Sequence, residues 1–284
     1  MVYRLLAIDI DGTLLRSNHR IDRETKESIE YVKNKGVYVT LTTGRNFASA
    51  KKIAKAVKLD DSILITHNGG FIASSVEEPV YERRFSSDQV TKIVEILEKY
   101  DCHIRIIHER QAVGNRVQQK NYLAAKMTLG IGDPLFYPVS FVETLSDHVE
   151  ENPISPPKID AHFFDEEERA AAHREFAVSM PEVDVTKSTK CNFEVVPKGV
   201  SKARGLSILG DKLGIGLDEM VAIGDSESDK KMIARVGLGV AMGNATRELK
   251  KIADWVTRSN DQRGVSYTVK EVFRKQMRVQ IKSK

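Results

Sequence analysis

The stretch that decides the fold is Leu5–Thr13, which reads LLAIDIDGT. Its apolar first half predicts a buried strand, and Gly12 opens a loop behind it. Asp9 and Asp11 stand two positions apart where that strand ends. In an open α/β sheet, ligands bind outside the carboxyl ends of the strands. One carboxylate of such a pair can attack while the other moves protons, so the pair predicts chemistry at this strand end.

Strand and helix patterns alternate after this stretch, which predicts a parallel sheet with helices on both faces. The predicted strands cover 4–10, 37–42 and 62–66, and the predicted helices run from the N-cap Asp22 to Gly36 and over 47–57. Two short segments, 71–74 and 79–85, predict a hairpin that leads out of the sheet. The fold class is therefore α/β, with a doubly wound, Rossmann-like parallel sheet.

A different pattern occupies the middle of the chain and predicts an inserted α+β module. Its predicted elements are helices over 90–100, 121–129 and 166–178 and strands over 103–108, 112–117 and 158–164. The α/β pattern then returns with strands over 193–197, 220–223, 238–241 and 254–257 and with helices over 201–213, 230–236 and from Asn244 onward. We therefore expect a core formed by 1–83 and 191–284, with an inserted domain over 84–190.

Composition and charge exclude several classes of protein. The chain has 284 residues, of which 41% are hydrophobic and 30% charged, as in soluble globular proteins. No apolar run is long enough to cross a bilayer, and no secretory signal pattern precedes the first strand. Two distant cysteines, Cys102 and Cys191, form no CxxC motif and fit a cytoplasmic protein.

The basic residues gather at the C-terminus. The last fifteen residues hold six lysines and arginines against one glutamate, while the net charge of the whole chain is only +4. The body therefore has no basic face, and we expect neither a nucleic-acid nor a membrane partner. The tail is typical of a solvated terminal helix or a frayed end. Whether the chain is a monomer or a homo-oligomer stays open.

Two further segments contribute polar groups where predicted strands end. In Thr42-Thr43-Gly44-Arg45, a hydroxyl and backbone N–H groups at a helix start can hold phosphate oxygens, although the same residues also suit a plain helix cap. Lys202, near the start of a helix, is a compact cation suited to a phosphate, although most helix lysines are simply solvated.

An acidic segment follows the predicted strand 220–223 and reads GDSESD over Gly224–Asp229. Asp225 and Asp229 are four positions apart, so one helical turn would bring them to the same side. Carboxylates clustered in this way suit Mg²⁺, although acidic residues also stabilise helix N-termini without any metal.

Together, the DxDGT, TGR, SK and GDxxxD segments resemble the haloacid dehalogenase superfamily, in particular its Cof-type phosphatases with a large α+β cap of the C2 type. The resemblance covers nearly the whole chain and includes the GLGVAMGNA run at Gly237–Ala245. It implies a Mg²⁺-dependent phosphatase acting on a small phosphorylated molecule, with the inserted domain as the cap that selects the substrate.

The resemblance also implies a role for each matching residue. Asp9 would be the nucleophile that forms an aspartyl-phosphate, and Asp11 the general acid and base whose main-chain carbonyl also binds Mg²⁺. Asp225 would hold the metal, with Asp229 behind it or bound through water. The implied phosphate-binding residues are Ile10, Thr43, Gly44, Lys202 and Ser228. Ser228 departs from the family, which usually has asparagine there.

Other functions keep the same residues. A phosphomutase on this scaffold would retain the core set, and a non-catalytic binding protein could retain the fold alone. Sugar phosphates, nucleotides and cofactor phosphates all stay open as substrates. Candidate contacts to the leaving group are His67, Asn68, His108, Arg116 and His162, although an ordinary structural role is more common for such residues.

Overall fold

The computed structural model describes residues 2–116, 138–187 and 191–276. The chain divides into two compact units, the first formed by Met1–Tyr81 with Ser201–Lys284 and the second, inserted unit by Glu82–Val200. The predicted helix over 121–129 and the last eight residues of the basic tail lie outside the described residues.

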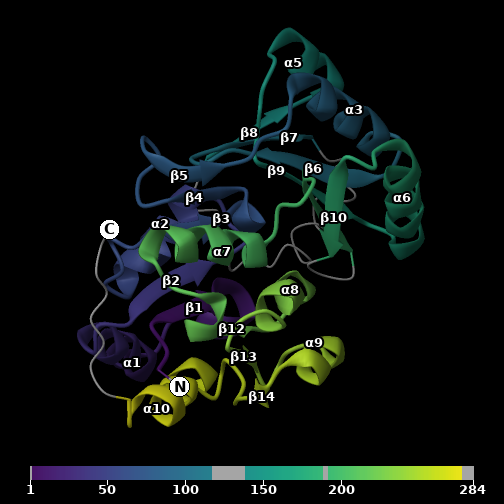
Figure 1. Cartoon of the computed structure of the whole chain (residues 1–284). Helices are drawn as coiled ribbons and strands as arrows, with labels where there is room; N and C mark the ends of the chain where they lie inside the picture. Colours follow the sequence, from purple (N-terminus) through teal and green to yellow (C-terminus); the bar gives the residue numbers. More distant parts are fainter. Residues whose placement is uncertain (1, 117–137, 188–190, 277–284) are drawn as a thin grey trace. The chain divides into compact units, whose positions relative to one another are not determined.

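The first unit is built on an eight-stranded sheet with the order β14-β13-β12-β1-β2-β3-β4-β5 (Figure 1). Its strands are β1 (Leu5–Asp9), β2 (Tyr38–Thr42), β3 (Leu64–Thr66), β4 (Phe71–Ala73), β5 (Pro79–Glu82), β12 (Met220–Gly224), β13 (Leu238–Ala241) and β14 (Trp255–Val256). β1 lies at the centre and pairs in parallel with β2 and β12. Its residues are buried throughout, as expected for a strand covered on both faces.

Helices cover both faces of this sheet. They are α1 (Arg23–Asn34), α2 (Phe47–Ala56), α7 (Lys202–Leu213), α8 (Lys230–Ile233), α9 (Arg247–Ile252) and α10 (Gly264–Phe273). Figure 1 shows α1 packed beside α10 on one side of the strands, with α7 and α8 on the other. The Asp22 carboxylate accepts the Thr25 N–H at 3.1 Å, which confirms the predicted N-cap of α1.

The predicted hairpin over 71–85 is correct in its strands but wrong in its place. β4 pairs antiparallel with β3, and β5 follows β4 at the edge, so the two strands extend the sheet rather than leave it. Ile72 and Ala73 are fully buried, and that burial favours pairing with the sheet.

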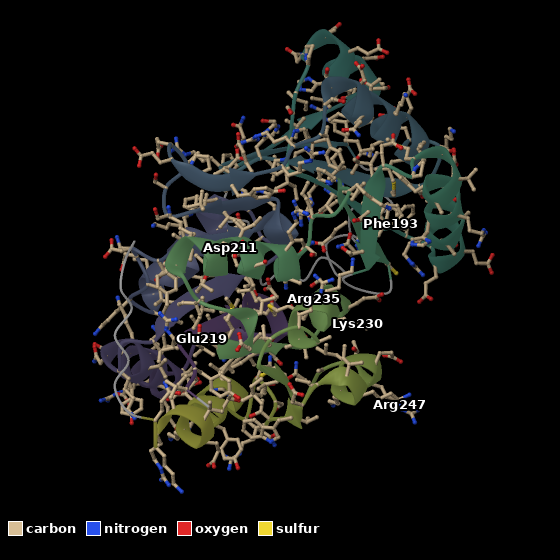
Figure 2. All side chains as sticks on the ribbon, viewed as in Figure 1. Phe193, Asp211, Glu219, Lys230, Arg235 and Arg247 are labelled. Carbon is tan, nitrogen blue, oxygen red and sulfur yellow. The ribbon has the colours of Figure 1, made fainter. Side chains whose placement is uncertain are left out.

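The inserted unit has a six-stranded sheet with the order β10-β11-β9-β6-β7-β8. Its elements are β6 (Cys102–Ile107), β7 (Ala112–Asn115), β8 (Val139–Val142), β9 (Lys158–Phe163), β10 (Val183–Lys187), β11 (Asn192–Pro197), α3 (Ser87–Leu97), α5 (Leu145–Glu151) and α6 (Glu166–Ser179). Its own core includes Phe193, whose ring centroid lies 4.8 Å from that of Phe163 and 5.6 Å from that of Phe176 (Figure 2).

The strand over 193–197 belongs to the inserted unit, whereas the sequence assigned it to the core. It forms most of β11, which pairs antiparallel with both β9 and β10. The predicted boundary at 190/191 therefore falls ten residues before the division at 200/201. A short apolar strand has the same pattern in either sheet, so periodicity could not assign it.

Within the described ranges, none of the helices combines the length and the apolar character that a membrane crossing needs.

Candidate active site

The nucleophile predicted from the sequence lies at the carboxyl end of the central strand. Asp9 ends β1 and is only 4% exposed. Its Oδ1 accepts a hydrogen bond from Lys202 Nζ at 2.6 Å. These residues are 193 positions apart in the sequence and meet because α7 begins beside the same edge of the sheet.

Lys202 is a buried cation rather than a solvated helix lysine. Ser201 caps the start of α7 by accepting the Arg204 N–H, which fixes the first turn. Besides Asp9, Lys202 Nζ donates to Asp229 Oδ1 at 2.7 Å. Burial alone would lower the pKa of Lys202, but Asp229 and Asp9 raise that pKa by more, so the ammonium stays charged.

The acidic loop after β12 supplies two further carboxylates. Asp225 Oδ1 accepts a hydrogen bond from Thr13 Oγ1 at 3.1 Å. Asp229 Oδ2 accepts the backbone N–H groups of Asp225 at 3.1 Å and of Ser226 at 3.0 Å. With Lys202 on its other oxygen, Asp229 holds both the loop and the ammonium in place.

Asp9, Asp225 and Asp229 offer oxygen atoms that lie within 4.8 Å of one another. Three ionised carboxylates and one ammonium leave this group a formal charge of −2, which is costly at buried positions. Burial first, and then the neighbouring carboxylates, hold the pKa of Asp9 well above its usual range despite Lys202. Burial and Asp229 raise the pKa of Asp225 to about 7. An oxygen-rich site with excess negative charge fits a divalent cation such as Mg²⁺.

Glycine residues allow the two loops of the site to approach each other. Gly12 has φ +74°, and a Cβ added there would lie 2.3 Å from Asp225 Oδ2. A Cβ at Gly224 would lie 2.5 Å from Asp229 Cγ. Asn244 Nδ2 also donates to the Gly12 carbonyl at 2.8 Å, which ties the loop after β1 to the segment before α9.

Asp11 points elsewhere. Its side chain is 52% exposed and accepts two hydrogen bonds from Arg45, at 2.6 Å and 2.7 Å. The structure therefore places Asp11 beside the TGR segment and outside the group formed by Asp9, Asp225 and Asp229.

The implied phosphate-binding residues lie around the same strand ends. Thr43 is buried, and its Oγ1 accepts the Arg45 N–H at 3.1 Å, next to Gly44. The Ile10 side chain is buried in the core, which leaves its main chain as the part that can bind a ligand. Ser228 Oγ lies 2.9 Å from Ser226 Oγ. Phosphate binding by these residues stays a prediction.

Sequence reasoning gave no role to four residues that build the site: Thr13, Arg45, Ser226 and Asn244. All four stand inside the segments quoted from the sequence, and that position was the available signal. Ser226 Oγ donates to Asp229 Oδ2 at 3.1 Å, and Asn244 reaches Gly12 across 232 positions. The contact of Asn244 with Gly12 leaves no trace in local spacing, whereas Ser226 and Asp229 are only three positions apart.

Contact of the other histidine, asparagine and arginine candidates with a leaving group stays a prediction. His162 lies opposite His103 in the pairing of β9 with β6, and burial lowers the pKa of both, to about 4 for His103. Arg116 forms an ion pair with Glu143. His67 and Asn68 are buried in the turn His67–Gly69 after β3, and His108 is half-buried.

A family model described as haloacid dehalogenase-like hydrolase matches residues 6–269. The chain therefore belongs to this family. This confirms the resemblance stated from the sequence, including its Cof-type phosphatase branch, and the doubly wound α/β fold with an inserted α+β unit. The protein is a phosphatase that acts on small-molecule phosphates, and hydrolases of this family generally use a divalent metal.

Individual relatives match this chain over nearly its full length. The chain is 48% identical over 278 residues to the stress response protein YhaX of Bacillus subtilis, covering 98% of this chain and 96% of that protein. It is 30% identical to the 5-amino-6-(5-phospho-D-ribitylamino)uracil phosphatase YcsE of Bacillus subtilis, covering 94% of each. The solved structure of the subclass IIB sugar phosphatase BT4131 matches with a TM-score of 0.79 and 26% identity, over 94% of this chain and 98% of that one.

Substituting Gly12 should damage the site specifically. Gly12→Ala places a Cβ against Asp225, so we expect phosphatase activity to fall by roughly tenfold or more, together with about 1 kcal/mol of stability lost to the left-handed backbone. Gly214→Ala is the matched control, because Gly214 has φ +64° and a Cβ there meets nothing within 4 Å. It should lose similar stability and keep its activity. Equal activity in the two variants would contradict the assigned role of Gly12.

Proposed function

We propose that this phosphatase hydrolyses a small phosphate monoester through an aspartyl-phosphate on Asp9, with Mg²⁺ as its cofactor. The observation that supports the proposal is the buried ammonium of Lys202, which lies 2.6 Å from Asp9 and 2.7 Å from Asp229. A nucleophilic carboxylate beside a fixed cation suits attack on an anionic phosphate, where positioning and charge neutralisation supply most of the catalysis.

In the first half of the reaction, a carboxylate oxygen of Asp9 forms a bond to phosphorus while the bond from phosphorus to the ester oxygen breaks. Asp11 gives its proton to that ester oxygen, which leaves as an alcohol. Lys202 stays beside Asp9 and offsets part of the negative charge that the phosphate brings. General acid help of this kind is typically worth about 10²–10⁴-fold.

In the second half, water attacks the phosphorus of the aspartyl-phosphate. Asp11, now a carboxylate, takes a proton from the water as the new oxygen–phosphorus bond forms. The bond between phosphorus and Asp9 breaks, which releases inorganic phosphate and restores the Asp9 carboxylate. Asp11 is again protonated and ready for the next ester.

Asp9, Asp225 and the main-chain carbonyl of Asp11 are the groups that we propose hold Mg²⁺. Asp229 supports them from behind, because its two oxygens already accept from Lys202 and from the loop N–H groups. When bound, the metal supplies positive charge that offsets the repulsion between the Asp9 carboxylate and the phosphate oxygens.

For the substrate we propose a sugar phosphate, a nucleotide or a cofactor phosphate. The names of two relatives support this range, since one is a phosphatase of a phosphoribityl compound and the other a sugar phosphatase. In both names the phosphate belongs to a sugar-like group. A phosphate-release screen over such esters with Mg²⁺ identifies the preferred substrate.

Asp9→Asn tests the covalent step. We expect turnover to fall at least about 10³-fold while the circular dichroism spectrum stays native, because the amide cannot attack phosphorus. Acid-quenched wild-type enzyme should carry a phosphoryl group on Asp9 by peptide mass spectrometry, and the variant should carry none. Near-normal turnover in a preparation shown by mass to be free of deamidation would exclude this mechanism.

Mg²⁺ should stabilise the protein as well as activate it. A cation bound at a hundredfold excess over its Kd adds about 2.7 kcal/mol, which raises the unfolding temperature by several degrees. Asp225→Asn should lose most of that Mg²⁺-dependent rise, and EDTA should abolish both the rise and the activity. Asp211→Asn, at an exposed position on α7, is the control and should respond as wild type does. If Mg²⁺ raised the unfolding temperature of Asp225→Asn as much as that of the wild type, Asp225 would not be a ligand of the metal.

A further inference from the structure

Arg45 contacts Asp11 at two points. Arg45 Nε donates to Asp11 Oδ2 at 2.7 Å, and Arg45 Nη2 donates to Asp11 Oδ1 at 2.6 Å. Paired hydrogen bonds between a planar guanidinium and a carboxylate fix orientation as well as distance. We propose that Arg45 is the positioning residue for Asp11, an inference that rests on the proposed role of Asp11 as general acid and base.

Arg45 is itself firmly held, as a positioning residue must be. Its side chain is only 10% exposed, and Nη1 donates to Ser49 Oγ at 3.0 Å. The Ser49 N–H in turn donates to the Asn46 carboxamide oxygen that caps α2. The Arg45 carbonyl accepts the His67 N–H at 3.0 Å, so its main chain is fixed to the turn after β3.

Asp11 has little other support. Its side chain is 52% exposed and lies in the irregular turn Ile10–Leu14, just before the left-handed Gly12. Among the described residues, Arg45 supplies every hydrogen bond that the Asp11 carboxylate accepts. An acid or base works only when it is held within about half an ångström of its productive geometry. Without Arg45, the Asp11 side chain would sample other rotamers in solvent.

The contact is compatible with both protonation states of Asp11. When Asp11 carries a proton, its carbonyl oxygen can still accept one Arg45 hydrogen bond, and its hydroxyl is left to donate to the ester oxygen. Transfer of that proton to the leaving oxygen, as the phosphorus–oxygen bond breaks, turns Asp11 into a carboxylate that accepts both hydrogen bonds.

The test compares two esters of similar shape in the Arg45→Gln variant. Phenolate is a poor leaving group that needs the acid, whereas p-nitrophenolate leaves readily as an anion. We expect kcat/KM, which reports the steps up to release of the alcohol, to fall roughly tenfold for phenyl phosphate and less than threefold for p-nitrophenyl phosphate. For the nitrophenyl ester kcat and KM should fall by the same factor. Asp11 also activates water for hydrolysis of the aspartyl-phosphate, and this later step slows without changing kcat/KM.

Three further variants serve as controls. Arg45→Lys keeps one compact charged group. Its ratio of kcat/KM for the two esters should therefore lie between the ratios of the wild type and of Arg45→Gln. Arg4→Gln removes an arginine that is paired with Glu219 elsewhere in the same unit and should leave the ratio unchanged. The double variant Asp11→Asn with Arg45→Gln should have the same ratio of kcat/KM for the two esters as Asp11→Asn alone, because the group that Arg45 positions is already lost.

The inference fails if kcat/KM falls equally for both esters, which is the signature of a general structural role, or if neither ester responds. This failure is distinct from that of the proposed function. Full turnover by Asp9→Asn would overturn the mechanism, whereas an inactive Asp9→Asn with an unchanged ester ratio in Arg45→Gln overturns the role of Arg45 alone. Circular dichroism of Arg45→Gln, with Arg45→Lys as the milder variant, confirms that a folded enzyme is compared.

Discussion

The ammonium of Lys202 is the group on which the geometry of the site depends. Removing it would leave two buried carboxylates facing each other with no cation between them, and an uncompensated buried charge costs several kcal/mol. Its pairing with Asp9 and Asp229 joins β1, the start of α7 and the loop after β12 at one point. The same contacts that offset the cost of burying these charges therefore set the distances between Lys202 and the two carboxylates.

Glycine residues in the two loops allow this cluster of charged side chains to form. Parallel pairing of β1 with β12 brings the ends of both strands to one edge, but side chains at Gly12 and Gly224 would keep the loops apart. Glycine at both positions lets the carboxylates approach one another, and burial first, with their mutual repulsion added, raises the pKa values of Asp9 and Asp225. A divalent cation held by these carboxylates, as we propose, would remove that repulsion.

The sequence predicted the elements that local pattern controls. The apolar run before Asp9, the Asp22 cap and the strands around Val221 and Val240 follow from periodicity and turn chemistry, and the motifs located the acidic residues. It missed β8 and β10 and misassigned β11, because short strands take their place from partners far along the chain. For the same reason it identified Arg45 only as part of a motif, since the contact with Asp11 spans 34 positions.

Two cation–carboxylate pairs flank the site, and their different burial matches different tasks. The Asp9–Lys202 pair is almost completely buried, so its geometry is rigid and its charges are poorly screened, and the ammonium offsets part of the burial that raises the pKa of Asp9, the proposed nucleophile. The Asp11–Arg45 pair has a buried cation but a half-exposed carboxylate. In the proposed mechanism Asp11 changes charge twice in each turnover, and it does so at lower cost near water because solvent stabilises the charged form. With the arginine inside and the aspartate outside, the proposed acid–base would stay oriented in either protonation state.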